Sequence, residues 1–114
     1  MMQSKEEQIK SICEEIKQSC GIDYRYDHFK EKEAVPPPFL IYRRQPAQSF
    51  SADNKTYFKD GEVDIELYAS TPDEMYDLME KVEQLLDEYE IYYNLAADTN
   101  YIDSEDFYES LYET

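Results

Sequence analysis

Glycine is nearly absent from this chain. Gly21 and Gly61 are the only two glycines among 114 residues. Loops that cradle phosphate groups need several glycines, because side chains would keep the backbone away from the phosphate oxygens. The scarcity of glycine therefore excludes a Walker-type or dinucleotide-binding loop.

Residues for nucleophilic catalysis and for metal binding are equally sparse. His28 is the only histidine, so no catalytic triad can be singled out. The acidic stretch with Asp98, Asp103, Glu105 and Asp106 has neither the spacing nor the glycine of an EF-hand, which favours an ordinary loop. With 27 acidic residues, no single pair of carboxylates stands out as general acid and base. We therefore expect a protein that is not an enzyme and that has no metal or cofactor.

Cysteines and long apolar runs are also few. Cys13 and Cys20 are seven residues apart on a predicted helix, which separates them by roughly 10.5 Å along its axis and excludes a disulfide between them. No run approaches the length of a membrane span, and no apolar segment of a signal peptide lies near the start. We expect a protein without a membrane segment that is made in a reducing cytoplasm.

Negative charge is what the chain has in excess. It carries 11 basic and 27 acidic residues, for a net charge of −16. Residues 1–50 hold eight of each sign, whereas residues 51–114 hold three basic and nineteen acidic residues. The net charge therefore belongs to the second part, either as a solvated acidic surface or as a wall that repels a polyanion.

The clearest pattern covers residues 61–86. Apolar Val63, Ile65 and Leu67 alternate with acidic residues, which predicts a strand with one face buried and one face in water. The acidic residues of the wet face are Glu62, Asp64 and Glu66. This strand leads directly into a helical pattern.

Two amphipathic helices are predicted. The second begins at the cap residue Thr71, with Pro72 at its first position, and its apolar stripe consists of Met75, Leu78, Met79, Val82, Leu85, Leu86 and Tyr89. The first begins at the cap residue Ser4 and ends at Gly21, with an apolar stripe of Ile9, Ile12, Cys13, Ile16 and Cys20. Each stripe must cover a sheet.

Further strands are predicted at 22–29, 39–42, 90–94 and 107–112, with an acidic turn over 98–106. The apolar run 39–42 suits an interior strand that ends at Arg43 and Arg44. Residues 45–59 are polar and suit a projecting loop. We predict one α+β domain over 1–114, a mainly antiparallel sheet of four or five strands with two helices packed on one face.

Three segments carry a resemblance to a known family. They are PPPFLIYRR at 36–44, VDIELYASTPDEMYDLMEKVEQLL at 63–86 and EDFYESLYET at 105–114. Across roughly residues 5–114 the chain resembles the small tail terminator, or tail completion, proteins of phages and prophages of Gram-positive bacteria. The resemblance implies a structural protein of the virion, assembled in the host cytoplasm, that forms a ring, typically of six copies. Such a ring ends the tail tube at its head-proximal end, and its partners are the tail tube protein and the head-tail connector protein.

A ring through which DNA passes benefits from a wall that does not hold phosphates. Glu62, Asp64 and Glu66 are candidates for such a lumen-facing wall, or for plain solvent exposure. Candidate contacts with another subunit or a partner are Arg43, Arg44, Phe50, Asp53, Lys55 and Tyr57. DNA would pass through without being specifically bound.

An acidic DNA mimic that inhibits a DNA-binding host protein is the alternative. It accounts for the net charge without a ring. It leaves the neutral first fifty residues and the predicted loop at 45–59 without a role.

Overall fold

The computed structural model describes residues 4–30, 32, 34–45 and 62–114. Within them the chain forms two helices and five strands: α1 (Lys5–Cys20), β1 (Asp23–Tyr26), β2 (Phe39–Arg44), β3 (Val63–Ala69), α2 (Pro72–Glu88), β4 (Asn94–Ile102) and β5 (Phe107–Glu113). Apart from Gln45, the predicted loop at 45–59 lies outside the described residues. The same holds for four candidate contact residues, Phe50, Asp53, Lys55 and Tyr57.

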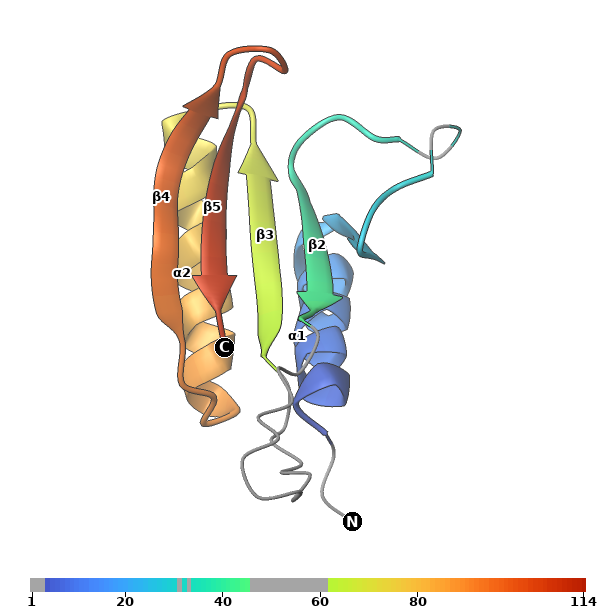
Figure 1. Cartoon of the computed structure of the whole chain (residues 1–114), viewed down its shortest axis with the longest axis vertical. Coiled ribbons are helices and arrows are strands. Elements are labelled where there is room, and N and C mark those ends of the chain that lie inside the picture. The colour runs from blue at the N-terminus through green and yellow to red at the C-terminus, as the bar shows by residue number, and fades with distance from the viewer. Residues whose placement is uncertain (1–3, 31, 33, 46–61) are drawn as a thin grey trace, which may run out of the picture.

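All five strands belong to one sheet, in the order β1-β2-β3-β5-β4 (Figure 1). Only β1 and β2 pair in parallel, and the other three pairings are antiparallel. The last strand in the sequence, β5, lies between β3 and β4. The predicted α+β class with a mainly antiparallel sheet is confirmed.

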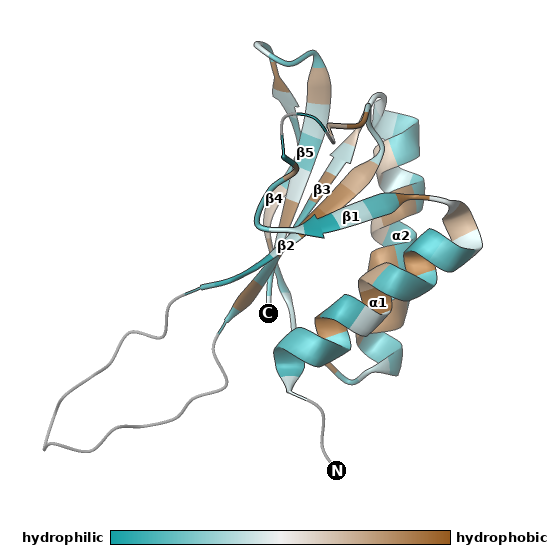
Figure 2. Ribbon diagram, turned by 90° about the vertical axis from the view of Figure 1, so that its right-hand side faces the viewer, coloured by the Kyte–Doolittle hydropathy of each residue, from teal (hydrophilic) through white to brown (hydrophobic). Residues whose placement is uncertain are grey.

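Both helices lie on the same side of this sheet (Figure 2). Ile12 and Ile16 of α1 share one core with Met79, Val82 and Leu86 of α2. The strands contribute every second residue to that core, among them Leu40, Tyr42, Val63, Ile65, Leu67 and Tyr112. The common core of the two predicted stripes is confirmed, but Cys20, predicted as part of the first stripe, is exposed at the end of α1.

The helix ends follow the predicted caps. The Ser4 hydroxyl accepts a hydrogen bond from the Glu7 amide, and the Thr71 hydroxyl accepts one from the Glu74 amide, each at 3.2 Å. The Glu74 carboxylate reaches back to the Ser70 amide at 2.8 Å. Gly21 ends α1 with φ of 71°, a backbone conformation that glycine adopts without strain.

Several predicted strand boundaries are wrong. β1 is shorter than 22–29, whereas β2 ends at Arg44, within the predicted exit at Arg43 and Arg44. The strand predicted at 90–94 starts only at Asn94, because Glu90 turns the chain with φ of 57°. β4 then continues through most of the predicted turn, as far as Ile102. Pairing with β5 outweighs the low strand propensity of its Asp and Asn residues.

The two cysteines are free thiols in different surroundings. Cys13 is buried and Cys20 is exposed. Burial raises the pKa of the Cys13 thiol to about 12, so this side chain stays protonated and unreactive in the core. Among the described residues, neither helix has the length and apolar character needed to cross a membrane.

Candidate functional site

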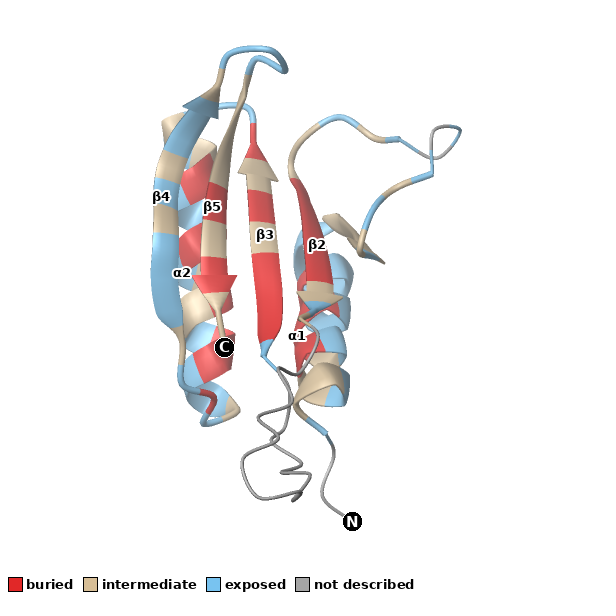
Figure 3. Cartoon of the chain, viewed as in Figure 1, coloured by how far each residue is buried: buried red, intermediate tan, exposed pale blue. Residues whose placement is uncertain are grey.

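No helix of the described residues covers the sheet face opposite α1 and α2, which we call the open face (Figures 1 and 2). It carries the strand residues that alternate with those of the core. From β2, β3 and β5 these are Phe39, Ile41, Arg43, Asp64, Glu66, Tyr68, Phe107, Glu109, Leu111 and Glu113. Figure 3 shows that the middle strands of this face are buried or half-buried, because their own large side chains pack over the backbone.

Four aromatic rings cluster at one end of the open face. Phe39 stacks on Tyr68 with ring centroids 4.8 Å apart, and Phe107 meets Tyr68 at 5.3 Å. Phe29, from the connection between β1 and β2, packs edge-on against Phe39 at 5.0 Å. These rings line a hollow of about 320 Å³, called the aromatic hollow, together with Ile41, Ile102, Glu105 and Glu109. The hollow combines an apolar floor with two carboxylates.

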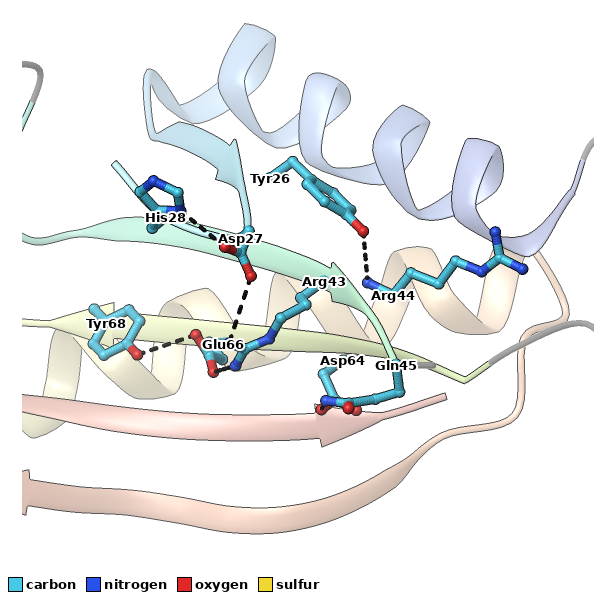
Figure 4. A network of polar contacts seen from close by, with 9 residues as sticks. All are labelled: Tyr26, Asp27, His28, Arg43, Arg44, Gln45, Asp64, Glu66 and Tyr68. Carbon is cyan, nitrogen blue, oxygen red and sulfur yellow. Dashed lines mark hydrogen bonds and ion pairs between the residues drawn. The ribbon is translucent and has the colours of Figure 1, made fainter. Parts of the chain in front are cut away.

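A polar network adjoins the hollow on the same face (Figure 4). Arg43 on β2 binds the Glu66 carboxylate on β3 at 2.6 Å and approaches Asp27 at 3.6 Å. The Tyr68 hydroxyl donates to the other oxygen of Glu66 at 3.2 Å. Glu66 therefore connects the network to the aromatic ring of the hollow.

Burial determines the protonation behaviour of this network. It raises the pKa of Glu66, and the nearby Arg43 only partly offsets that effect. Burial also raises the pKa of Tyr68 well above its ordinary range, with further contributions from the carboxylates of Glu66 and Glu109. The Tyr68 hydroxyl thus remains a hydrogen-bond donor at neutral pH.

The three acidic residues predicted for a wet face lie in different surroundings. Glu62 precedes β3 and is exposed, Asp64 is only 7% exposed, and Glu66 is half-buried in its ion pair. The prediction of a solvated face is wrong for Asp64. Its Oδ2 accepts a hydrogen bond from the side-chain amide of Gln45, and its Oδ1 is buried without a partner among the described residues.

The two arginines predicted as subunit or partner contacts also lie in different surroundings. Arg43 forms its ion pairs within the chain. Arg44 is exposed, and its backbone amide donates to the Tyr26 hydroxyl at 3.4 Å. A contact with a neighbouring subunit stays a prediction for both arginines, since the Arg43 side chain is also 40% exposed.

The negative charge gathers on the outer surface of α2. This helix carries seven acidic residues and one lysine. Its exposed stripe, at spacings of three and four residues, consists of Asp73, Asp77, Glu80, Gln84 and Asp87. In the part of the chain that the structure describes, no three His, Cys, Asp or Glu side chains are arranged to hold a metal ion.

Sequence reasoning missed the aromatic hollow. Phe29, Phe39, Tyr68 and Phe107 come from four separate segments, and only the strand pairing brings them together. The available signal was the continued alternation from Asp64 and Glu66 to Tyr68, which places this ring on the face opposite the core.

Fold and site together define an α+β domain whose helix-free face presents an aromatic hollow beside a carboxylate network. Comparisons of the chain with protein-family models, curated proteins and solved structures found no match.

Proposed function

We propose that this protein is a non-catalytic structural subunit of a phage or prophage tail. In this proposal it forms a ring, of six copies as in the family it resembles, that ends the tail tube and joins it to the head connector. The observation that carries the proposal is the helix-free sheet face with its aromatic hollow. Aromatic side chains of this kind supply much of the binding energy where proteins meet.

The surface outside the hollow supports an assembly role as well. Large hydrophobic side chains are exposed at Tyr26, Tyr76, Tyr92, Leu95 and Tyr101, and Tyr92 is 97% exposed. Tyrosine suits interfaces because it combines a large apolar ring with a polar tip. These side chains lie on several elements, as expected for a subunit that contacts more than one neighbour.

Tube assembly tests the proposal. The cognate tube protein is polymerised with and without this chain, and tube length and end-bound copies are measured by electron microscopy and quantitative gel analysis. The proposal expects shorter tubes that carry a fixed number of copies at one end. Tubes of unchanged length without bound protein would contradict it.

The acidic stripe of α2 favours a DNA mimic as the second candidate. Reversal of Asp77, Glu80 and Asp87 to Lys distinguishes the two functions. All three residues are exposed, and we expect substitutions at such positions to leave the fold intact. A DNA mimic would lose its DNA-binding target. A tail terminator would still cap tubes, and DNA exit would slow only if the stripe faced the passage, where added cations retain phosphates.

A further inference from the structure

The aromatic hollow has a composition that selects its occupant. Its floor consists of aromatic and aliphatic side chains, and the carboxylates of Glu105 and Glu109 lie at its wall. An occupant that matches this surface has aromatic side chains next to positive charges.

Among residues 51–114, one segment of this chain has that chemistry. Residues 55–59 read KTYFK, so that Tyr57 and Phe58 are flanked by Lys55 and Lys59. Beyond residue 50 the only other basic residue is Lys81, which lies on α2, on the helix side of the sheet. The segment is therefore the one basic and aromatic stretch in the acidic part of the sequence.

Chain length makes contact with the hollow of the same molecule unfavourable. From Tyr57 to Glu62 there are five residues, which span at most ~18 Å when fully extended. The rings of Phe39 and Tyr68 lie six residues past Glu62, ~20 Å along β3, and of the lining residues on β2 only Ile41 lies nearer, opposite Glu66. Tyr57 therefore comes near these rings in its own chain only if residues 57–62 are fully extended along β3, whereas the hollow of another chain is under no such restriction.

We propose that the aromatic hollow of one subunit binds residues 55–59 of a second copy of this chain. Tyr57 and Phe58 pack on Phe39, Tyr68 and Phe107, and the two lysines pair with Glu105 and Glu109. Each copy then donates a segment and accepts one. Such a head-to-tail contact joins different surfaces and closes into a ring when the rotation between copies permits it.

This inference rests on the proposed function, because it supplies the contact that links the ring subunits. Cross-linking tests it in a chain with Cys20→Ser, which removes the exposed thiol, while the buried Cys13 remains. New cysteines are placed by Thr56→Cys within the segment and by Ser104→Cys beside the wall residue Glu105. Both substitutions leave the aromatic side chains and the paired charges intact.

A short bismaleimide should link a chain that carries both cysteines into a ladder of multimers that stops at the ring size. Mixed single variants should give only a dimer. The ladder should be lost with Glu105→Lys and Glu109→Lys together, and with the control pair Thr56→Cys and Tyr76→Cys, whose second position lies on the exposed surface of α2. A product linked only within one chain, or equal yield from the control pair, would overturn the inference.

A peptide probe gives a readout that does not need assembly. A synthetic peptide of residues 52–61 should shift the NMR signals of Tyr68 and Phe107 in the full chain, and the same peptide with Tyr57→Ala and Phe58→Ala should not. Tube capping without cross-links through the hollow would reject this contact and leave the proposed function standing. Cross-links and peptide binding without tube capping would support the contact and reject the proposed function.

Discussion

At the scale of single residues, burial and the ion pair with Arg43 have opposite effects on the pKa of Glu66. Its carboxylate binds Arg43 at 2.6 Å, yet burial raises its pKa above the ordinary value of 4.5. A carboxyl whose pKa is raised on folding stabilises the folded state while it is protonated, and that contribution is lost as the pH rises through the raised pKa. The ionised form of Glu66 therefore costs stability at neutral pH.

We predict that Glu66→Gln is more favourable at pH 7 than at pH 4. The amide keeps one acceptor oxygen for Arg43, its NH2 group can donate to the Tyr68 hydroxyl oxygen, and it does not ionise. Urea unfolding of both proteins at the two pH values measures the change in the free energy of unfolding. Glu80→Gln, at an exposed position of α2, is the control for the loss of one negative charge. An equal difference between wild type and Glu66→Gln at both pH values would show that the pKa of Glu66 is not raised.

Val82 provides the residue-scale test of the core. Its side chain is fully buried between α2 and the sheet. We predict that Val82→Asp lowers the free energy of unfolding by at least about 4 kcal/mol, because it buries a charge without a partner. Circular dichroism and urea unfolding measure the loss, and Gln84→Asp on the exposed side of the same helix should have little effect. Normal stability of Val82→Asp would mean that α2 does not pack as described.

At the scale of elements, the start of α2 depends on one hydroxyl. The Thr71 side chain accepts a hydrogen bond from the Glu74 amide at 3.2 Å. We predict that Thr71→Ala lowers the free energy of unfolding by about 1 kcal/mol, since an amide of the first turn loses its acceptor. Thr71→Ser keeps the hydroxyl and should retain most of the stability. Equal losses for the two variants in urea unfolding would argue against a capping role.

The elements also show what the sequence could and could not predict. The α2 stripe and the caps at Ser4 and Thr71 were predictable, because local spacing and side-chain chemistry determine them. The extent of β4 and the place of β5 beside β3 were not, since pairing between distant segments determines both. The same limit applies to the site, where the burial of Asp64 and the assembly of the hollow depend on strand order.

At the scale of the whole molecule, the base of the predicted loop lies where two strands meet. The backbone amide of Gln45 donates a hydrogen bond to the backbone carbonyl of Glu62 at 2.8 Å, so the two ends of the intervening segment are already adjacent. A short hairpin turn can therefore join β2 to β3.

We predict that replacing residues 46–61 by such a turn leaves the fold intact and abolishes ring formation. Circular dichroism and thermal unfolding measure the fold, and light scattering with size-exclusion chromatography measures assembly. A matched variant keeps the full length and changes only Lys55, Tyr57, Phe58 and Lys59 to Ser. Rings of normal size from either variant would remove the segment from the assembly contact.

The mass of the tube-bound complex shows whether this chain closes into a ring at the end of the tail tube. Capped tubes, formed from the cognate tube protein and this chain, are fragmented and their ends are weighed by native mass spectrometry. A single closed ring of this chain, of six copies, is expected at one tube end. Tube ends without this chain, or with a number of copies that varies from end to end, would contradict the account.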